Sequence, residues 1–327
     1  KTGRSRVAGR SARSRAAALA VALAALVGGC GLPTSSAEPG SRTIEADGRP
    51  LVLTTMTVLA DMARQVGGDH VEVVSIIPPG VEVHGYEPTP GDLRRGAQAD
   101  LVLDNGLGLE GWFEQFVARV EAPHVVVGAE VEPIPITRGE YRGAANPHAW
   151  MSPVEGARYV DRIETALAEL APEHAAEFAT RATAYRAQIE QVGRGLIDAL
   201  DRLDDEHRVL VTCEGAFSYL ARDAGLEEAY LWAVNAEQQG TAHQLAAVVD
   251  LVRDREVPAV FCESTVSGDV MQAVVAATGA RFGGVLYVDS LSEPDGPVPT
   301  YLDLLRYDVA TIVQGLTGDT AEPGAGR

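Results

Sequence analysis

Two histidines and two carboxylates follow apolar runs of this 327-residue sequence, and together they could bind a metal. They are His84, His148, Glu214 and Asp289. Imidazole nitrogens bind zinc, iron and manganese, whereas carboxylate oxygens favour the harder cations. Two carboxylates would also neutralise the charge of a dication. Brought together, these side chains would make a site for a divalent first-row transition metal.

The apolar runs that precede these residues predict an α/β protein with two lobes. The first set alternates with helical patterns and covers residues 51–55, 71–77, 100–104 and 124–128. The pattern restarts after residue 207, with runs at 208–212, 229–232, 259–262 and 283–288. Such alternation is typical of mainly parallel sheets flanked by helices, and ligands bind beyond the carboxyl ends of parallel strands. We therefore expect a four-stranded sheet in each lobe and the candidate ligands in a cleft between the lobes.

His84 lies in a stiff turn. Pro79 and Pro88 flank it, and the residues from Thr89 to Asp92 have the pattern of a capped helix start. A rigid turn suits a metal ligand, which must arrive in a fixed position. It also suits an ordinary turn residue.

The other three candidates have structural alternatives as well. His148 would be a buried histidine, Glu214 a charge at a helix N-terminus, and Asp289 a cap for the loop that follows it. The metal interpretation depends on the equivalent placement of all four at strand ends. The remaining histidines lack this placement, and we expect them to be surface or packing residues: His70, His124, His174, His207 and His243.

A helical stretch separates the two sets of strands. Residues 152–155, Ser-Pro-Val-Glu, fit the N-cap and first turn of a helix with a capping box. A second helix is predicted to begin near Pro172 and to continue for about 30 residues, roughly 45 Å, because its apolar residues recur every three or four positions. It would join the two lobes, although an ordinary helix packed on one lobe is the alternative. Gly193 and Gly195 interrupt it, either as a bend or as a close packing point.

The N-terminal residues predict secretion and lipidation. Residues 1–29 combine six basic side chains with an apolar run that is shorter than the roughly 20 residues a membrane span needs, which is typical of a signal peptide. Cys30 follows small residues, as in a bacterial lipobox, so we expect it to be lipidated and to anchor the chain to the outer face of the cell membrane. The alternative is a signal peptide with an incidental cysteine. Residues 30–49 would be a flexible tether.

The remaining boundaries follow from these elements. We assign the N-terminal lobe, the linking helix, the C-terminal lobe and a disordered tail to residues 50–171, 172–204, 205–317 and 318–327. The formal net charge is −19, and removal of the six basic leader residues leaves about −25. Such an acidic chain is a poor partner for nucleic acid. The composition, 46% apolar and 22% charged, is that of a globular protein.

Two cysteines remain if Cys30 is acylated. Cys213 and Cys262 each end a predicted strand and precede Glu214 and Glu263. If these strands are neighbours, a disulfide can form between them, which suits an oxidising compartment. The alternative is two buried free thiols. A bridge would fix the strand end that carries Glu214, so we hypothesise that metal affinity responds to the redox state.

Several long segments, in order over about residues 50–316, resemble the solute-binding proteins of bacterial manganese, zinc and iron ABC transporters. The segments are PPGVEVHGYEPTPGDL, ADLVLDNGLGLEGW, NPHAWMSP, VTCEGAFSYLARDAGL, NAEQQGT, and LYVDSL with TYLDLLRYDVATIVQGL. The resemblance implies two lobes joined by one long helix. It places four residues of this chain on the metal-ligand positions: His84, His148, Glu214 and Asp289.

The resemblance also bears on the choice of metal. Zinc-type members tend to have histidine at the third ligand position, and manganese- or iron-type members glutamate; here the residue is Glu214. Zinc-type members often carry a histidine- and acid-rich loop before the second ligand, and this chain has no histidine there. Both features favour Mn(II) as the cargo. Zn(II) or Fe(II) is the alternative, because zinc binds N/O sites more tightly than manganese.

The expected function is capture of a divalent metal outside the cytoplasm, by a monomer, and its delivery to an ABC-transporter permease. Binding needs neutral imidazoles, so affinity should fall as the pH drops through about 6.5. A metalloenzyme is a second hypothesis, but a fourth protein ligand argues against it, since catalytic metals keep one position open. A surface adhesin is a third, which no exposed patch in the sequence supports. We therefore expect no catalysis.

Overall fold

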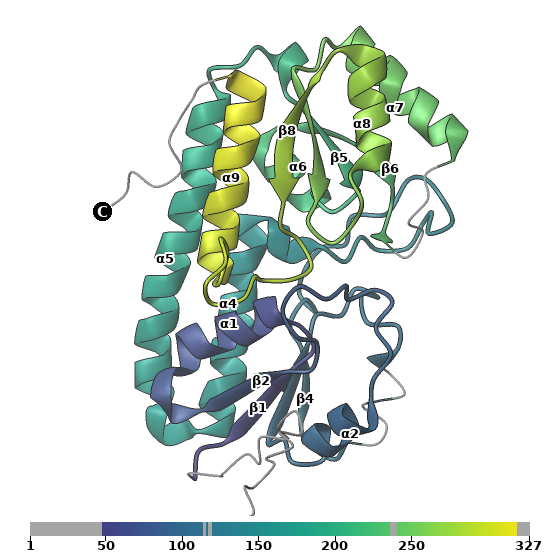
Figure 1. Cartoon of the computed structure of the whole chain (residues 1–327). Helices are drawn as coiled ribbons and strands as arrows, with labels where there is room; N and C mark the ends of the chain where they lie inside the picture. The colour runs from purple at the N-terminus through teal and green to yellow at the C-terminus, as the bar shows by residue number, and fades with distance from the viewer. Residues whose placement is uncertain (1–47, 114–115, 117–119, 236–240, 319–327) are drawn as a thin grey trace, which may run out of the picture. The chain divides into compact units, whose positions relative to one another are not determined.

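The computed structural model describes residues 48–113, 116, 120–235 and 241–318 (Figure 1). The predicted signal peptide, Cys30, nearly all of the tether and nearly all of the tail lie outside the described residues. The strands are β1 (Leu51–Thr54), β2 (Glu72–Ser75), β3 (Leu101–Asp104), β4 (His124–Val126), β5 (Val209–Glu214), β6 (Glu227–Trp232), β7 (Ala259–Glu263) and β8 (Arg281–Leu286). Each lies on a run that the sequence predicted as a strand.

Helices connect and flank these strands. The α-helices are α1 (Thr57–Gly67), α2 (Pro90–Gly96), α4 (Pro153–Leu170), α5 (Ala175–Leu200), α6 (Ser218–Ala224), α7 (Ala242–Asp254), α8 (Asp269–Thr278) and α9 (Tyr301–Thr317). Short 3-10 helices are η1 (Gly68–His70), η2 (Ala149–Met151), η3 (Pro172–His174) and η4 (Asp205–His207). Among the described residues, no helix is both long enough and apolar enough to cross a membrane.

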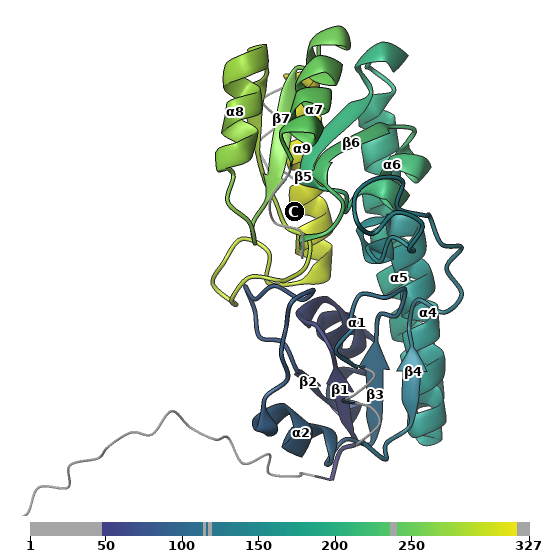
Figure 2. The same cartoon turned by 90° about the vertical axis from the view of Figure 1, so that its right-hand side faces the viewer.

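The first lobe is built on one parallel sheet, as predicted. Its strand order is β2-β1-β3-β4, and every neighbouring pair is parallel (Figure 2). All residues of β1 and β3 are buried. Strands that are buried on both faces become continuous apolar runs in the sequence, which is why LVLT and LVLD were easy to assign. The carboxyl ends of the strands lead into the loops that carry the histidines.

The second lobe differs from the prediction of one four-stranded sheet. Its four strands are present and parallel, but hydrogen bonds pair them as two sheets, β5 with β6 and β7 with β8. β5 and β7 still lie side by side, because a disulfide joins Cys213 to Cys262 across a Cα–Cα distance of 4.8 Å. At their carboxyl ends, the backbone N–H of Glu214 donates to the side chain of Glu263 rather than to a strand carbonyl. A hydrogen bond to a side chain thus replaces a backbone hydrogen bond between the two strands.

The start of α4 matches the sequence pattern in part. Ser152 is the N-cap, and its hydroxyl accepts hydrogen bonds from the N–H groups of Val154 and Glu155. The reciprocal half of the predicted capping box was wrong, because the Glu155 carboxylate binds Arg222 and Arg158 instead. The ion pair with Arg222 connects the start of α4 to α6.

The predicted linking helix is α5, which begins just after the 3-10 turn at Pro172. It packs against α1 in the first lobe and against α6 and α9 in the second, so it reaches along both (Figure 1). Gly193 is a close packing point: an added Cβ would lie 2.9 Å from Pro153 Cβ. Gly195 faces open space. The alternative of a helix packed on one lobe was wrong.

Candidate metal centre

Four separate segments bring the predicted ligands to one place. His84 lies in the loop between β2 and α2, and His148 directly precedes η2. Glu214 is the last residue of β5, and Asp289 follows β8. One donor atom from each of the four lies within 4.8 Å of those of the other three. The four predicted ligands therefore converge, as expected for residues that follow the carboxyl ends of parallel strands.

The distances between donor atoms suit one shared cation. His84 Nε2 lies 3.1 Å from His148 Nε2 and 3.3 Å from Glu214 Oε1. His148 Nε2 lies 3.5 Å from Glu214 Oε1 and 3.7 Å from Asp289 Oδ1, which is 3.9 Å from His84 Nε2. Ligands about 2.1 Å from a tetrahedral ion lie roughly 3.4 Å apart. The observed separations bracket that value.

Burying the charged side chains of this centre is energetically unfavourable unless their charges are neutralised. His148, Glu214 and Asp289 are almost completely buried, whereas the His84 side chain remains 6% exposed. Two buried carboxylate oxygens, Glu214 Oε2 and Asp289 Oδ1, have no hydrogen-bond partner among the described residues. Buried polar atoms are normally satisfied, so such atoms call for an explanation such as a bound ion. Together with the donor distances, they suit a cation ligand set.

The loop that carries His84 is held by the helix cap that the sequence predicted. Thr89 Oγ1 accepts a hydrogen bond from the N–H of Asp92, and Asp92 Oδ2 accepts one from the N–H of Thr89 at 2.6 Å. Tyr86 OH also donates to Asp92 Oδ2, at 2.9 Å. Closer to the site, the N–H of His84 donates to Glu82 Oε1. These bonds fix the turn at both ends.

Asn146 orients His148. Its Nδ2 donates to Gly215 O, so its Oδ1 faces His148 and accepts hydrogen bonds from both the backbone N–H and the ring Nδ1 of that residue. A proton on Nδ1 leaves the lone pair on Nε2, which is the atom that faces the other ligands. Such outer partners set the tautomer and orientation of ligating histidines. Because Gly215 belongs to the second lobe, this support crosses between the lobes.

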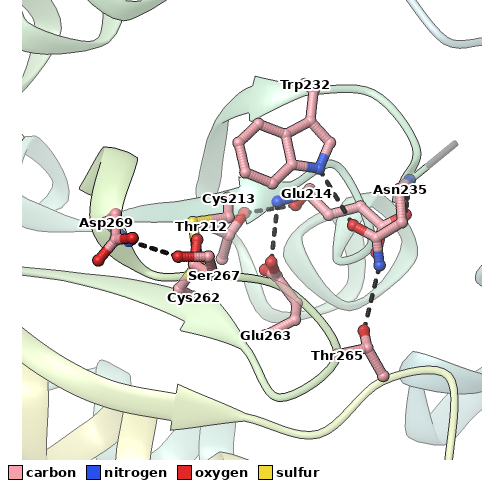
Figure 3. The surroundings of a disulfide bond; sticks show 10 residues. All are labelled: Thr212, Cys213, Glu214, Trp232, Asn235, Cys262, Glu263, Thr265, Ser267 and Asp269. Atoms are coloured by element: carbon pink, nitrogen blue, oxygen red, sulfur yellow. Dashed lines mark hydrogen bonds between the residues drawn. A yellow bond between two sulfur atoms is a disulfide. The ribbon is translucent and has the colours of Figure 1, made fainter. Parts of the chain in front are cut away.

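Asn235 donates hydrogen bonds to both carboxylates of the site. Its backbone N–H donates to Glu214 Oε1 at 2.7 Å, and its side-chain Nδ2 lies 3.0 Å from both Asp289 Oδ2 and Glu82 Oε2. Trp232 Nε1 donates to Asn235 Oδ1, which fixes the amide (Figure 3). Sequence reasoning missed these roles. Glu82, Asn146 and Asn235 do lie in the segments that carried the resemblance.

The predicted disulfide is present, and Cys213 is the chain neighbour of Glu214 (Figure 3). Cys213 precedes Glu214, and Cys262 precedes Glu263. Glu263 Oε2 accepts the hydrogen bond from the N–H of Glu214 at 3.0 Å. Burial, reinforced by the charge of Glu214, raises the pKa of Glu263 well above its usual range. Glu263 thus supports the end of the strand that carries Glu214.

The four candidates titrate very differently from free side chains. Burial would lower the pKa of His84, but its hydrogen bond to Glu214 and the charges of Glu214 and Asp289 outweigh this and raise it to about 9. Burial lowers the pKa of His148. Burial would raise the pKa of Glu214, but the two imidazoles lower it to about 2. Burial and the charge of Glu214 raise the pKa of Asp289 well above its usual range.

Two α/β lobes with two imidazoles and two carboxylates at their strand ends define a class, the two-lobed metal-binding proteins. Comparison with known proteins gives the family. Residues 52–315 match the family described as zinc-uptake complex component A, periplasmic, and the chain belongs to this family.

Individual relatives agree with this assignment. The chain is 48% identical over 265 residues to the iron-binding protein YfeA of Yersinia pestis, covering 81% of this chain and 85% of that protein. It is 30% identical over 296 residues to the manganese-binding lipoprotein MntA of Halalkalibacterium halodurans, covering 90% of this chain and 96% of that protein. Its fold is similar to a Mn-bound periplasmic metal-binding protein from Candidatus Liberibacter asiaticus, with a TM-score of 0.77, 34% identity, and coverage of 82% of this chain and 100% of that one.

The family settles the general activity. Its members are extracytoplasmic substrate-binding proteins of ABC importers for divalent metals. The chain therefore binds a divalent metal outside the cytoplasm, works with a permease, and is a binding protein rather than an enzyme. The metalloenzyme hypothesis was wrong.

Proposed function

We propose that this protein captures Mn(II) through His84, His148, Glu214 and Asp289 and delivers it to its permease. The convergence of these four donors, with two unpartnered carboxylate oxygens buried among them, carries the proposal. Two ionised carboxylates balance the charge of a dication. Two neutral imidazoles complete the ligand set of the metal. The alternative roles of the four residues, as caps or turn residues, would leave the unpartnered carboxylate oxygens unexplained.

The donor set supports manganese over zinc. Each carboxylate has a second oxygen, so two imidazoles and two bidentate carboxylates offer up to six donor atoms. Manganese prefers oxygen-rich, higher coordination, whereas zinc is usually four-coordinate. Zinc still binds mixed N/O sites more tightly than manganese in general, so the metal available to the cell takes part in the choice.

Iron is the second candidate. The relative named as an iron-binding protein shares 48% identity with this chain, more than the 30% shared with the manganese-binding lipoprotein. Ferrous and manganous ions have similar ligand preferences, so one site can serve both. We propose that the site accepts Fe(II) as well as Mn(II).

The anchoring of the protein is part of the proposal. Residues 1–29 would be removed as a signal peptide, and Cys30 would be lipidated as the first residue of the mature chain. Residues 30–49 would form the tether, 50–171 and 205–317 the two lobes, and 172–204 the linking helix. The protein would act as a monomer on the outer face of the membrane.

The test is a competitive titration of the chain from about residue 38 onward, prepared free of metal. Mn(II), Fe(II) and Zn(II) are added under anaerobic conditions, and bound metal and melting temperature are followed. Asp289→Asn should abolish tight Mn(II) binding, whereas the exposed control Asp295→Asn should bind one Mn(II) ion as the native chain does. Tight Mn(II) binding that survives Asp289→Asn would remove this residue from the site. No saturable Mn(II) or Fe(II) binding would overturn the proposed cargo.

A further inference from the structure

A second group of metal-ligating side chains lies outside the four-ligand centre. It consists of His70 in η1, His174 at the end of η3 and Glu177 in the first turn of α5. Their donor atoms lie within 4.8 Å of one another. His70 and Glu177 are 107 positions apart in the sequence, so the fold assembles this group. From their positions in the sequence, both histidines were expected to be surface or packing residues.

The two imidazoles of this group are stacked, and a carboxylate lies at their edge. His70 Nε2 lies 2.7 Å from Glu177 Oε2, and the rings of His70 and His174 stack with centroids 3.7 Å apart and planes 20° apart. Stacked rings do not point their lone pairs at one ion. Both rings are partly exposed, and an ion beside Glu177 would require them to reorient about the bond between Cβ and the ring.

The surroundings favour a fixed position and a cation. The ring of the buried Phe178 lies 5.9 Å from the ring of His70 and provides an apolar surface against which the group packs. The N-terminal end of α5 carries a partial positive charge that opposes a cation, but Glu177 in its first turn and Glu173 in the preceding η3 offset it. The nearby cation Arg181 is bonded to the backbone of α1, since its Nε donates to Gln65 O at 2.9 Å.

We propose that His70, His174 and Glu177 form a second divalent-metal site that prefers Zn(II) to Mn(II). Two imidazoles and one carboxylate, with water in the fourth position, match the tetrahedral coordination that zinc accepts. Manganese favours a higher share of oxygen ligands, so it gains less from this group. A bound ion would join η1, which follows α1 in the first lobe, to the start of the linking helix. Zn(II) titrations would then report two ions where Mn(II) titrations report one.

The experiment counts Zn(II) and Mn(II) equivalents by calorimetry and by mass spectrometry under non-denaturing conditions. The native chain should take up two Zn(II) ions and one tight Mn(II) ion. His174→Gln and Glu177→Gln should each weaken the second Zn(II) equivalent by at least about tenfold, since even the loss of outer partners of a metal ligand costs that much. Mn(II) binding at the four-ligand centre should be unchanged.

Matched variants separate this site from the four-ligand centre. His243→Gln and Glu190→Gln replace exposed residues of the same types and should leave both Zn(II) equivalents in place. Asp289→Asn should remove the Mn(II) site but keep one Zn(II) equivalent that is lost on adding His174→Gln. A single Zn(II) equivalent in the native chain would overturn the proposal, and so would a second equivalent that His174→Gln leaves unchanged.

Discussion

The two halves of the metal centre are supported in opposite ways. The histidines are carried by loops of the first lobe, and the only exposed part of the centre is the 6% of the His84 side chain that remains accessible. The carboxylates lie at the ends of second-lobe strands. Glu214 belongs to β5 itself, beside the Cys213–Cys262 disulfide, and both carboxylates accept hydrogen bonds from Asn235. The carboxylate half is therefore fixed by covalent and hydrogen-bonded supports, and the histidine half by a turn and one amide.

The two halves therefore differ in role: the carboxylates supply negative charge, and His84 provides access from solvent. A preformed pair of carboxylates attracts and neutralises the cation without a large rearrangement. His84 is the proposed ligand through which the centre meets solvent, and its raised pKa, about 9, keeps a proton where the proposed metal would lie. The proton then acts as the counter-charge of Glu214 until a metal replaces it.

The largest expected effect follows from removing one charge from the carboxylate half. Glu214→Gln should weaken Mn(II) binding at pH 7 by about 3–5 kcal/mol, roughly 10²–10⁴-fold, because the ion loses a buried counter-charge. His84→Asn should cost roughly tenfold less, since the variant also removes the proton that the metal must displace. Competition titrations with a chelator measure both. Equal losses for the two variants would contradict the division between charge and access.

The second effect is on pH dependence. Because the pKa of His84 is about 9, the ring is protonated at pH 7 and must release its proton when metal binds. The apparent Mn(II) affinity should therefore keep rising, by about tenfold per pH unit, up to pH 9 and not level off above 6.5. An indicator dye in weak buffer should report the release of at least one proton per ion at pH 7. His84→Asn should lower the slope by about one, and a flat profile above pH 7 would exclude the protonated ring.

The same raised pKa has a consequence for the metal-free protein. A histidine near 6.5 when unfolded and near 9 when folded stabilises the fold fully below pH 6.5. This contribution disappears as the pH rises through 9. Taken alone, His84 should make the metal-free chain less stable to urea at pH 9 than at pH 7, and the difference should shrink in His84→Asn.

The third effect tests the support of the histidine half. Asn146→Leu removes the acceptor that fixes His148, and we expect Mn(II) affinity to fall by about 10–100-fold. Asn146→Asp keeps an acceptor for the ring Nδ1 and should retain more affinity than the leucine variant. If both variants bind as the native chain does, Asn146 does not set the tautomer of His148.

The strands and the four-residue set could be predicted from the sequence for a physical reason. Buried parallel strands are continuous apolar runs, and parallel topology sends their carboxyl ends to one edge, so His84 and Asp289 could be placed without coordinates. The supports of the site could not. Asn235 contacts Glu82, which is 153 positions away, and no local pattern marks such a contact.

The pairing of the second-lobe strands escaped prediction for a related reason. Apolar runs identify strands but not which backbone groups meet, and a side chain of Glu263 takes the N–H of Glu214. His70 and His174 were likewise set aside because only the fold brings them together. Local periodicity thus predicts elements, whereas contacts between distant segments need the structure.

The fourth effect concerns the covalent support of the carboxylate half. The disulfide closes a loop of 49 positions. Changing both Cys213 and Cys262 to Ser should lower the free energy of unfolding by about 2–4 kcal/mol. Metal affinity should fall by less, about threefold, since Asn235 and Glu263 still hold Glu214. Urea unfolding and metal titration on the same samples separate the two effects. Identical metal affinity in the double variant would end the idea that redox state tunes binding.

The smallest effect separates two glycines of α5. Gly193 packs on Pro153, just beyond the His148 segment, and an added Cβ would lie 2.9 Å from a rigid ring atom. Gly193→Ala should therefore displace Pro153 and the neighbouring His148 segment. We expect it to lower the free energy of unfolding by about 1–3 kcal/mol. Gly195 has nothing within 4 Å, so Gly195→Ala should stabilise the helix by about 0.5–1 kcal/mol. Thermal unfolding decides between them, and two stabilising substitutions would show that α5 does not hold the His148 segment through this contact.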